Sequence, residues 1–245
     1  MKFSNLFILV ITSLLLSCVT NSVAQGLKVG PSLGTYFSNK QGVNTVDSIK
    51  VVVDDVNQEA VVGIFAEGNI SKRLILRTEL NFFENFTDFA VFNDVEECQF
   101  CPVVKYTVAS TPTLELVVLP KLQLPMTKQA DLSLFAGPAV HFRFAKDINY
   151  IDFGRRHPGI TEVVDELDKS VSPVHVYLAY GASIDFWRLS LAGRIIQSAG
   201  HSSNREIEVY GKKYPIRFRD KFLFVTLSYK FNISSPISKT ITDTK

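Results

Sequence analysis

The sequence predicts an all-β protein, an eight-stranded antiparallel up-and-down transmembrane β-barrel with four long external loops and three short periplasmic turns. Three observations support this fold class. Apolar residues alternate with polar ones in eight segments that cover most of the chain, and almost no segment has helical periodicity. The connections between these segments alternate strictly between long and short. The chain also begins with an export signal.

The export signal occupies the first residues. Lys2 precedes an apolar run over residues 6–16, and Ser22 and Ala24 supply small side chains before a cut that follows Ala24. A lipoprotein-type site at Cys18 is the competing interpretation, although the bulky side chain before Ser17 fits it poorly. We therefore expect a signal peptide over residues 1–24, the barrel over residues 25–231, and a short polar periplasmic tail over residues 232–245.

The apolar segments have the length that a tilted strand needs to cross a bilayer, which is about 9–11 residues. The predicted strands cover residues 27–37, 61–70, 74–86, 114–124, 132–144, 174–186, 189–197 and 222–231. Pro31, Pro120 and Pro138 fall inside these segments. Because proline removes a donor from the ladder, we expect bulges or local breaks at these positions.

The connections indicate which end of the barrel faces outward. Tight connections cover residues 71–73, 126–131 and 187–188, whereas long polar ones cover 38–60, 87–113, 145–173 and 198–221. Outer-membrane barrels have short periplasmic turns and long external loops, and an even strand number returns both termini to the periplasm. In the third long connection, residues 161–167 are expected to form a short helical turn.

The polar faces of the predicted strands carry a mixed set of charges. In a barrel of eight strands the lumen is just wide enough for side chains to fill it. We therefore expect opposite charges to pair inside and to form a plug. His141 and His175 also alternate to inward faces, as ordinary lumen residues. The predicted lumen charge network comprises Lys28, Glu67, Arg77, Glu79, Glu115, Lys121, Arg143, Asp185, Arg194 and Lys230.

Aromatic residues gather where the predicted strands meet their connections, as the girdles at the two membrane interfaces do. A preference of strands for aromatic residues would give part of the same pattern. The residues concerned are Tyr36, Phe37, Phe82, Phe83, Phe86, Phe142, Phe144, Phe186, Trp187, Tyr229 and Phe231.

Composition and cysteine usage exclude several function classes. A net charge of +2 argues against a nucleic-acid binder, which would carry a concentrated basic excess. Beyond Cys18, the chain holds only Cys98 and Cys101, which we expect to close a small disulfide in an exported protein. No second CxxC pair and no clustered histidines are present, so the sequence predicts no metal site and no cofactor.

Three short motifs carry a family resemblance. Residues 26–34 (GLKVGPSLG), 135–138 (FAGP) and 227–231 (LSYKF) resemble the porin-like outer-membrane β-barrel family of Bacteroidota. The resemblance implies an outer-membrane location in a Gram-negative bacterium, in a family whose members mostly have no assigned activity. A type IX secretion component of similar barrel type is one candidate that the resemblance does not select. The tail after Phe231 departs from the pattern of barrels that end at a terminal aromatic residue.

The leading functional hypothesis is a non-enzymatic surface barrel that presents its loops to a partner or supports the envelope. The expected partners are outer-membrane lipid, lipopolysaccharide, and an envelope or secretion protein. The second long connection is acidic and the fourth is basic. A basic loop of this kind suits lipopolysaccharide phosphates, although an ordinary solvated loop would look the same. Its cations are Arg205, Lys212, Lys213, Arg217, Arg219 and Lys221.

Three alternatives remain open at this point. A small-solute porin would need a wider lumen or extra strands hidden in the long connections. A soluble periplasmic lipocalin-like barrel would use the same strands with their faces reversed. An enzyme is suggested only by His201 to Asn204, which resemble the H-x-S-N element of lipid A deacylase barrels. That resemblance implies His201 as the base and Ser203 as the nucleophile, with Glu206 or Glu208 as the orienting acid.

Overall fold

The computed structural model describes residues 26–46, 49–93, 104–144, 163, 166–167, 173–198, 203–209 and 211–233. The predicted signal peptide, Cys98, Cys101, His201 and the tail after Ile233 lie outside the described residues. Within the described ranges, no helix is long and apolar enough to cross a membrane.

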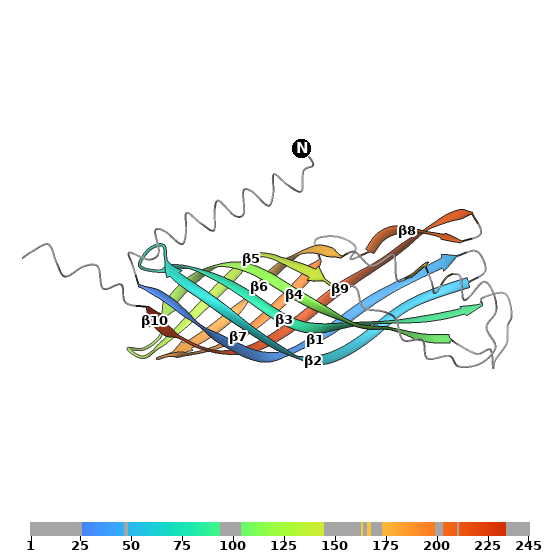
Figure 1. The fold of residues 1–245 in the computed structure, drawn as a ribbon. Helices are drawn as coiled ribbons and strands as arrows, with labels where there is room; N and C mark the ends of the chain where they lie inside the picture. The colour runs from blue at the N-terminus through green and yellow to red at the C-terminus, as the bar shows by residue number, and fades with distance from the viewer. Residues whose placement is uncertain are drawn as a thin grey trace, which may run out of the picture.

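The structure is a closed antiparallel barrel, which confirms the predicted fold class (Figure 1). Consecutive strands pair from β1 to β7, β7 pairs with β9, and β9 closes the barrel by pairing with β1 from Ser32↔Ser228 to Gln41↔Arg219. The strands are β1 (Leu27–Val46), β2 (Ile49–Asn69), β3 (Leu74–Asn93), β4 (Val104–Pro125), β5 (Ala130–Arg143), β6 (Val174–Phe186), β7 (Leu189–Ser198), β8 (Ser203–Val209), β9 (Lys212–Tyr229) and β10 (Phe231–Ile233).

Two of these strands are not part of the ring of eight strands that forms the barrel wall. The short β10 continues the line of β9 after Lys230 and pairs with the start of β1, down to Leu27↔Ile233. Among the strands that the structure describes, β8 pairs with the first part of β9 alone, from Val209↔Lys212 to Ser203↔Phe218. The barrel therefore closes with eight strands. β8 and the first part of β9 form a hairpin that extends beyond the rim of the barrel (Figure 1).

Several connections predicted as long loops are largely strand, which corrects the sequence interpretation. Pairing between β1 and β2 continues to Val46↔Ile49, so residues 38–60 form a hairpin instead of a loop. The β3–β4 pair extends to Val91↔Val104, and the fourth connection contains β8 and the start of β9. Beyond the membrane both faces of a strand can be polar, so the ladder continues where the apolar alternation stops.

The three strand prolines lie at gaps in the ladders, as predicted. On its closing side, β1 pairs with β10 up to Val29 and with β9 from Ser32, so Pro31 has no partner in that ladder. Pro120 and Pro138 lie inside a gap in the β4–β5 ladder, between the pairs Val117↔Ala139 and Lys121↔Phe135. Each proline therefore lies where no backbone donor is required.

The two faces of the barrel differ sharply in polarity. Outward positions are apolar and exposed, as in Leu223, Val225 and Leu227 of β9, whereas the alternate positions are buried in the lumen. The predicted aromatic girdle needs correction at Tyr36 and Phe83, which are buried in the lumen. Adjacent residues on a strand point to opposite faces, so only one of two neighbouring aromatic residues can face outward.

A cluster of buried apolar residues lies beyond the barrel rim, separate from the apolar residues inside the lumen. Val46, Val51 and Val53 of the β1–β2 hairpin and Phe218 of β9 are at most 1% exposed. This external cluster has further members in the third long connection and in the β8–β9 hairpin, namely Val163, Leu167, Ile207, Val209 and Ile216. Residues 163 and 166–167 of that connection are helical, in line with the predicted helical turn. The external cluster thus ties three separate segments into one folded unit.

Candidate functional site

An ion-pair network fills the lumen near the end with the short turns. It contains equal numbers of cations and anions, which are drawn from five strands and from the β9–β10 junction. Every side chain in it is at most 8% exposed. Such buried charges are tolerated only when they are paired and hydrogen-bonded. The members are Arg77, Lys121, Arg194 and Lys230 with Glu67, Glu79, Glu115 and Asp185.

Each carboxylate of the network binds at least two donors. Glu67 lies 3.0 Å from Arg77 Nη1, 2.9 Å from Lys121 Nζ and 3.2 Å from Lys230 Nζ. Lys230 Nζ also lies 2.9 Å from Asp185 Oδ1, so the pairs are connected. Because these groups come from β2, β3, β4, β6 and the β9–β10 junction, their contacts cross the lumen.

The second half of the network is centred on one guanidinium. Arg194 donates to Glu79 Oε2 and to Glu115 Oε2, at 2.6 Å in both cases. Asn81 Nδ2 also donates to both carboxylates, at 3.2 Å and 2.8 Å. His141 Nε2 lies 3.0 Å from the other oxygen of Glu115. The carboxylates of both acids are thus held from several strands at once.

An aromatic layer follows the ion pairs toward the long-connection end of the barrel. The ring centroids of Tyr36, Phe83 and Phe224 lie 4.8–5.4 Å apart in pairs. His141 extends the layer, with centroids 5.4 Å from Phe83 and 4.3 Å from Tyr177. The Tyr36 hydroxyl donates to the backbone carbonyl of Glu84. These rings fill the lumen with apolar bulk, and the Tyr36 hydroxyl, the Tyr177 hydroxyl and His141 Nε2 have hydrogen-bond partners.

A third set of polar contacts lies beyond the aromatic layer. Arg143 Nη2 and the Tyr177 hydroxyl each donate to Asp220 Oδ2 at 3.0 Å. Lys40 Nζ donates to Asn85 Oδ1 at 2.9 Å. Sequence reasoning missed Asp220 and Lys40 because both fall in segments predicted as loops. The signal that could have found them is the inward alternation, which continues through these segments once they are taken as strand.

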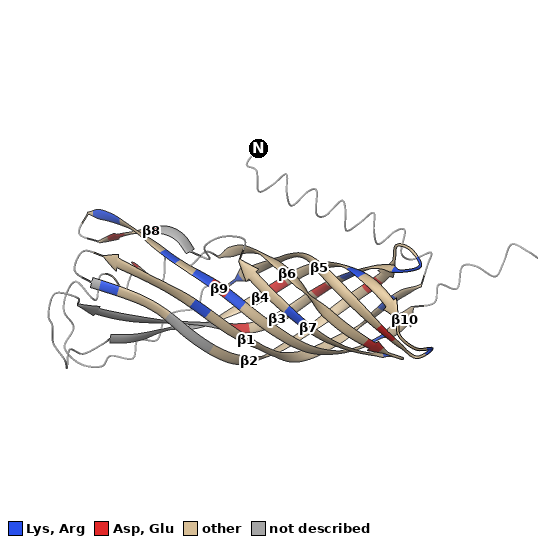
Figure 2. Ribbon diagram, turned by 180° about the vertical axis from the view of Figure 1, so that it is seen from behind, with Lys and Arg blue, Asp and Glu red and all other residues tan. Residues whose placement is uncertain are grey.

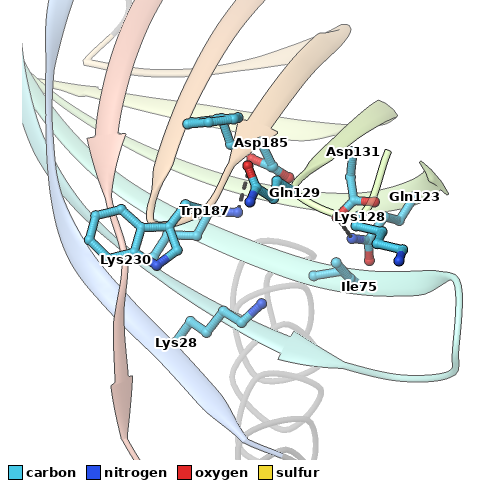
Figure 3. Close-up of a pocket in the computed structure, with 10 residues that line it drawn as sticks. Lys28, Ile75, Gln123, Lys128, Gln129, Asp131, Asp185, Trp187 and Lys230 are labelled. Carbon is cyan, nitrogen blue, oxygen red and sulfur yellow. Dashed lines mark hydrogen bonds and ion pairs between the residues drawn. The ribbon is translucent and has the colours of Figure 1, made fainter. Parts of the chain in front are cut away.

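Lys28, the remaining residue of the predicted lumen set, lies at the mouth of the barrel. It lines a cavity of about 510 Å³ at the short-turn end, together with Gln123, Asp131 and Trp187 (Figure 3). Asp185 and Lys230 line the same cavity and belong to the ion-pair network. The network therefore bounds this cavity on the side of the lumen.

The hydrolase motif is not assembled into a described site. Ser203 is the first residue of β8, and Glu206 and Glu208 are exposed on the same strand. His201 lies outside the described residues. Within the described part of the chain, no group of three or more His, Cys, Asp or Glu side chains could hold a metal ion.

Comparisons with known proteins point to the fold. No family model matches the chain, and no curated protein matches it. The structure is similar to the outer membrane protein OprG from Pseudomonas aeruginosa, at 10% identity and a TM-score of 0.51, over 84% of this chain and 96% of that chain.

Two further solved structures match with lower scores. The outer membrane protease OmpT from Escherichia coli has 9% identity and a TM-score of 0.48, over 85% of this chain and 97% of that chain. The attachment invasion locus protein Ail from Yersinia pestis has 10% identity and a TM-score of 0.39, over 84% of this chain and 99% of that chain. The likeness to OprG, at its low identity, shows the fold alone, and this chain has the fold of an outer-membrane β-barrel.

Proposed function

We propose that this chain is a non-enzymatic outer-membrane β-barrel with a sealed lumen, whose hairpins beyond the rim form an interaction surface. The observation that carries the proposal is the filling of the lumen. Side chains occupy the space that a channel would fill with water. They include ion pairs such as Arg194 with Glu115, and the aromatic layer around Tyr36.

The distribution of polarity supports placement in a membrane. Leu191, Ile184 and Leu227 are each at least 50% exposed on the outer face, whereas Glu115 and Lys121 are at most 1% exposed in the lumen. A soluble lipocalin-like barrel would need the reverse arrangement, with apolar side chains inside and charges in water. Lipid is the solvent that matches the observed arrangement.

The external cluster supports a role for the hairpins. Buried residues such as Val51, Leu167 and Ile207 hold the β1–β2 hairpin, the third connection and the β8–β9 hairpin together. A surface that is already folded loses little conformational entropy when it binds a partner. A preorganised platform on a rigid scaffold therefore suits an envelope or secretion partner outside the membrane.

Two alternatives have less support. A small-solute porin requires a water path, and the balanced ion pairs around Glu67 and Glu79 would have to separate to open one. A lipid A hydrolase requires His201, Ser203 and an acid in one site, and the described part of the motif places Glu206 and Glu208 on exposed strand positions.

Planar-bilayer recording tests the sealed lumen. The full chain, folded in detergent and inserted into bilayers, should give no discrete conductance steps, because ion pairs and aromatic side chains occupy the lumen. Insertion is verified separately by flotation of proteoliposomes that contain the same preparation. Sustained single-channel steps from inserted protein would overturn the proposal in favour of the porin alternative.

A further inference from the structure

The outward face of β9 changes from apolar to basic at one level of the barrel. Alternate residues along a strand share a face, so the odd-numbered residues of β9 form one outward row. In the part of this row nearer the short turns, Leu227, Val225 and Leu223 are exposed and apolar. The row continues without interruption through three exposed cations, Lys221, Arg219 and Arg217. The basic residues of β9 follow one another along the strand in Figure 2.

The neighbouring strands change from apolar to polar at the same level. Lys221 lies opposite Asn39 of β1 and Gln197 of β7, and Arg219 lies opposite Gln41 of β1. One step toward the short turns, Leu223 lies opposite Phe37 and Ile195. A boundary between apolar and polar side chains therefore runs across three adjacent strands. The outer edge of a lipid bilayer has this profile.

The three cations face no carboxylate among the described residues of these strands. The cross-strand neighbours of Lys221 and Arg219 on β1 and β7 are amides, which donate hydrogen bonds and carry no charge, and Arg217 lies opposite Asn204 of β8. Glu208 of β8 lies farther from the barrel, opposite Lys213, and Glu206 lies opposite Pro215. Glu208 therefore accompanies Lys213, and Glu206 lies one outward position from Arg217. The residues of β1 and β7 opposite Arg219 and Lys221 are not acidic, so the row has cations available to an external anion.

From this arrangement we propose that Arg217, Arg219 and Lys221 bind the phosphate groups of lipid A in the outer leaflet. Alternate residues on a strand lie about 7 Å apart, so the row presents cations at regular intervals along one edge of the lipid. Guanidinium groups match phosphate oxygens in a bidentate way, and the flanking amides supply further donors. The apolar residues directly below them contact the acyl chains of the same lipid. This site rests on the outer-membrane placement proposed above.

The site distinguishes lipid A from other phosphate sources. A soluble phosphate would gain nothing from the apolar row that begins at Leu223, and a glycerophospholipid offers fewer phosphates to three cations. The full barrel in detergent micelles is titrated with lipid A, dephosphorylated lipid A or phosphatidylglycerol, and bound lipid is counted by native mass spectrometry. We expect lipid A to bind about a hundredfold more tightly than the other two, because the phosphates add the attraction of three cations.

The matched variants isolate the row. Replacing the three cations together (Arg217→Gln, Arg219→Gln, Lys221→Gln) should reduce lipid A binding to the level of dephosphorylated lipid A. The control removes the same charge at the short-turn end (Lys72→Gln, Arg73→Gln, Lys128→Gln), where all three residues are exposed. The control should bind lipid A as the unaltered protein does. Equal binding by the β9 variant and the unaltered protein would overturn the proposal.

Further outcomes also decide the question. Dephosphorylated lipid A or phosphatidylglycerol binding as tightly as lipid A would overturn the lipid A assignment, as would displacement by an equal concentration of inorganic phosphate. Raising the salt concentration should weaken lipid A binding to the unaltered protein, which tests the site even if the β9 variant does not fold. Failure of the unaltered protein to reach the outer membrane would refute the proposed function instead of this site.

Discussion

Arg194 of β7 and Glu115 of β4 meet across the lumen at 2.6 Å, although β5 and β6 separate their strands in the sheet. Both side chains are at most 4% exposed. Each therefore helps to compensate a charge that water cannot reach. Their pairing closes the barrel interior from one wall to the opposite wall.

Removing Arg194 should destabilise the barrel strongly. Arg194→Leu leaves Glu79 and Glu115 with fewer donors in a buried site, and loss of one partner from such a pair costs about 3–5 kcal/mol. The measurement is the temperature at which the folded band converts to the unfolded band in electrophoresis. Arg73→Leu, on an exposed turn, is the control and should cost less than about 0.5 kcal/mol. Equal conversion temperatures for the two variants would contradict the structural role of the network.

A methyl group at Gly30 should strain the seam at which the barrel closes. A Cβ atom there would lie 1.7 Å from the backbone oxygen of Tyr229, on the strand that pairs with β1 at the seam. Gly30→Ala is expected to cost at least about 1–3 kcal/mol, because the backbone must shift. Gly193→Ala is the control, since a Cβ atom at that position meets nothing within 4 Å. The folded fraction after refolding measures the difference, and equal yields would show that the seam is looser than described.

Truncation of Leu167 should loosen the external cluster and leave the barrel intact. The side chain is fully buried among residues of both hairpins, and Leu→Ala in such a site costs about 2–5 kcal/mol. Hydrogen exchange should therefore accelerate in β8, whereas the heat-induced conversion of the barrel stays unchanged. Val43→Ala is the control, because Val43 is 64% exposed. Unchanged exchange in β8 would contradict the cluster as the link between the hairpins.

The eight barrel strands were predictable from the sequence. Lipid on one face and a packed lumen on the other require apolar and polar residues to alternate with a period of two. The same logic explains the errors. Outside the membrane the water-facing side no longer needs apolar residues, so Lys40 and Asp220 fell in segments predicted as loops. The alternation of apolar and polar residues also predicts which face of the sheet a side chain lies on, but not which residue it contacts across the lumen. That Arg194 reaches Glu115 depends on the closure and stagger of the barrel, which no local pattern encodes.

The orientation of the barrel in the outer membrane is tested most directly by labelling single cysteines in intact cells. Cys98 and Cys101 are first replaced by serine, and Lys213→Cys or Lys72→Cys is then introduced at an exposed position of the β8–β9 hairpin or of a short turn. A membrane-impermeant maleimide should label Lys213→Cys in intact cells and Lys72→Cys only after the outer membrane is permeabilised. Equal labelling of both positions in intact cells, or recovery of the protein in the soluble periplasmic fraction, would contradict a sealed barrel that presents its hairpins at the cell surface.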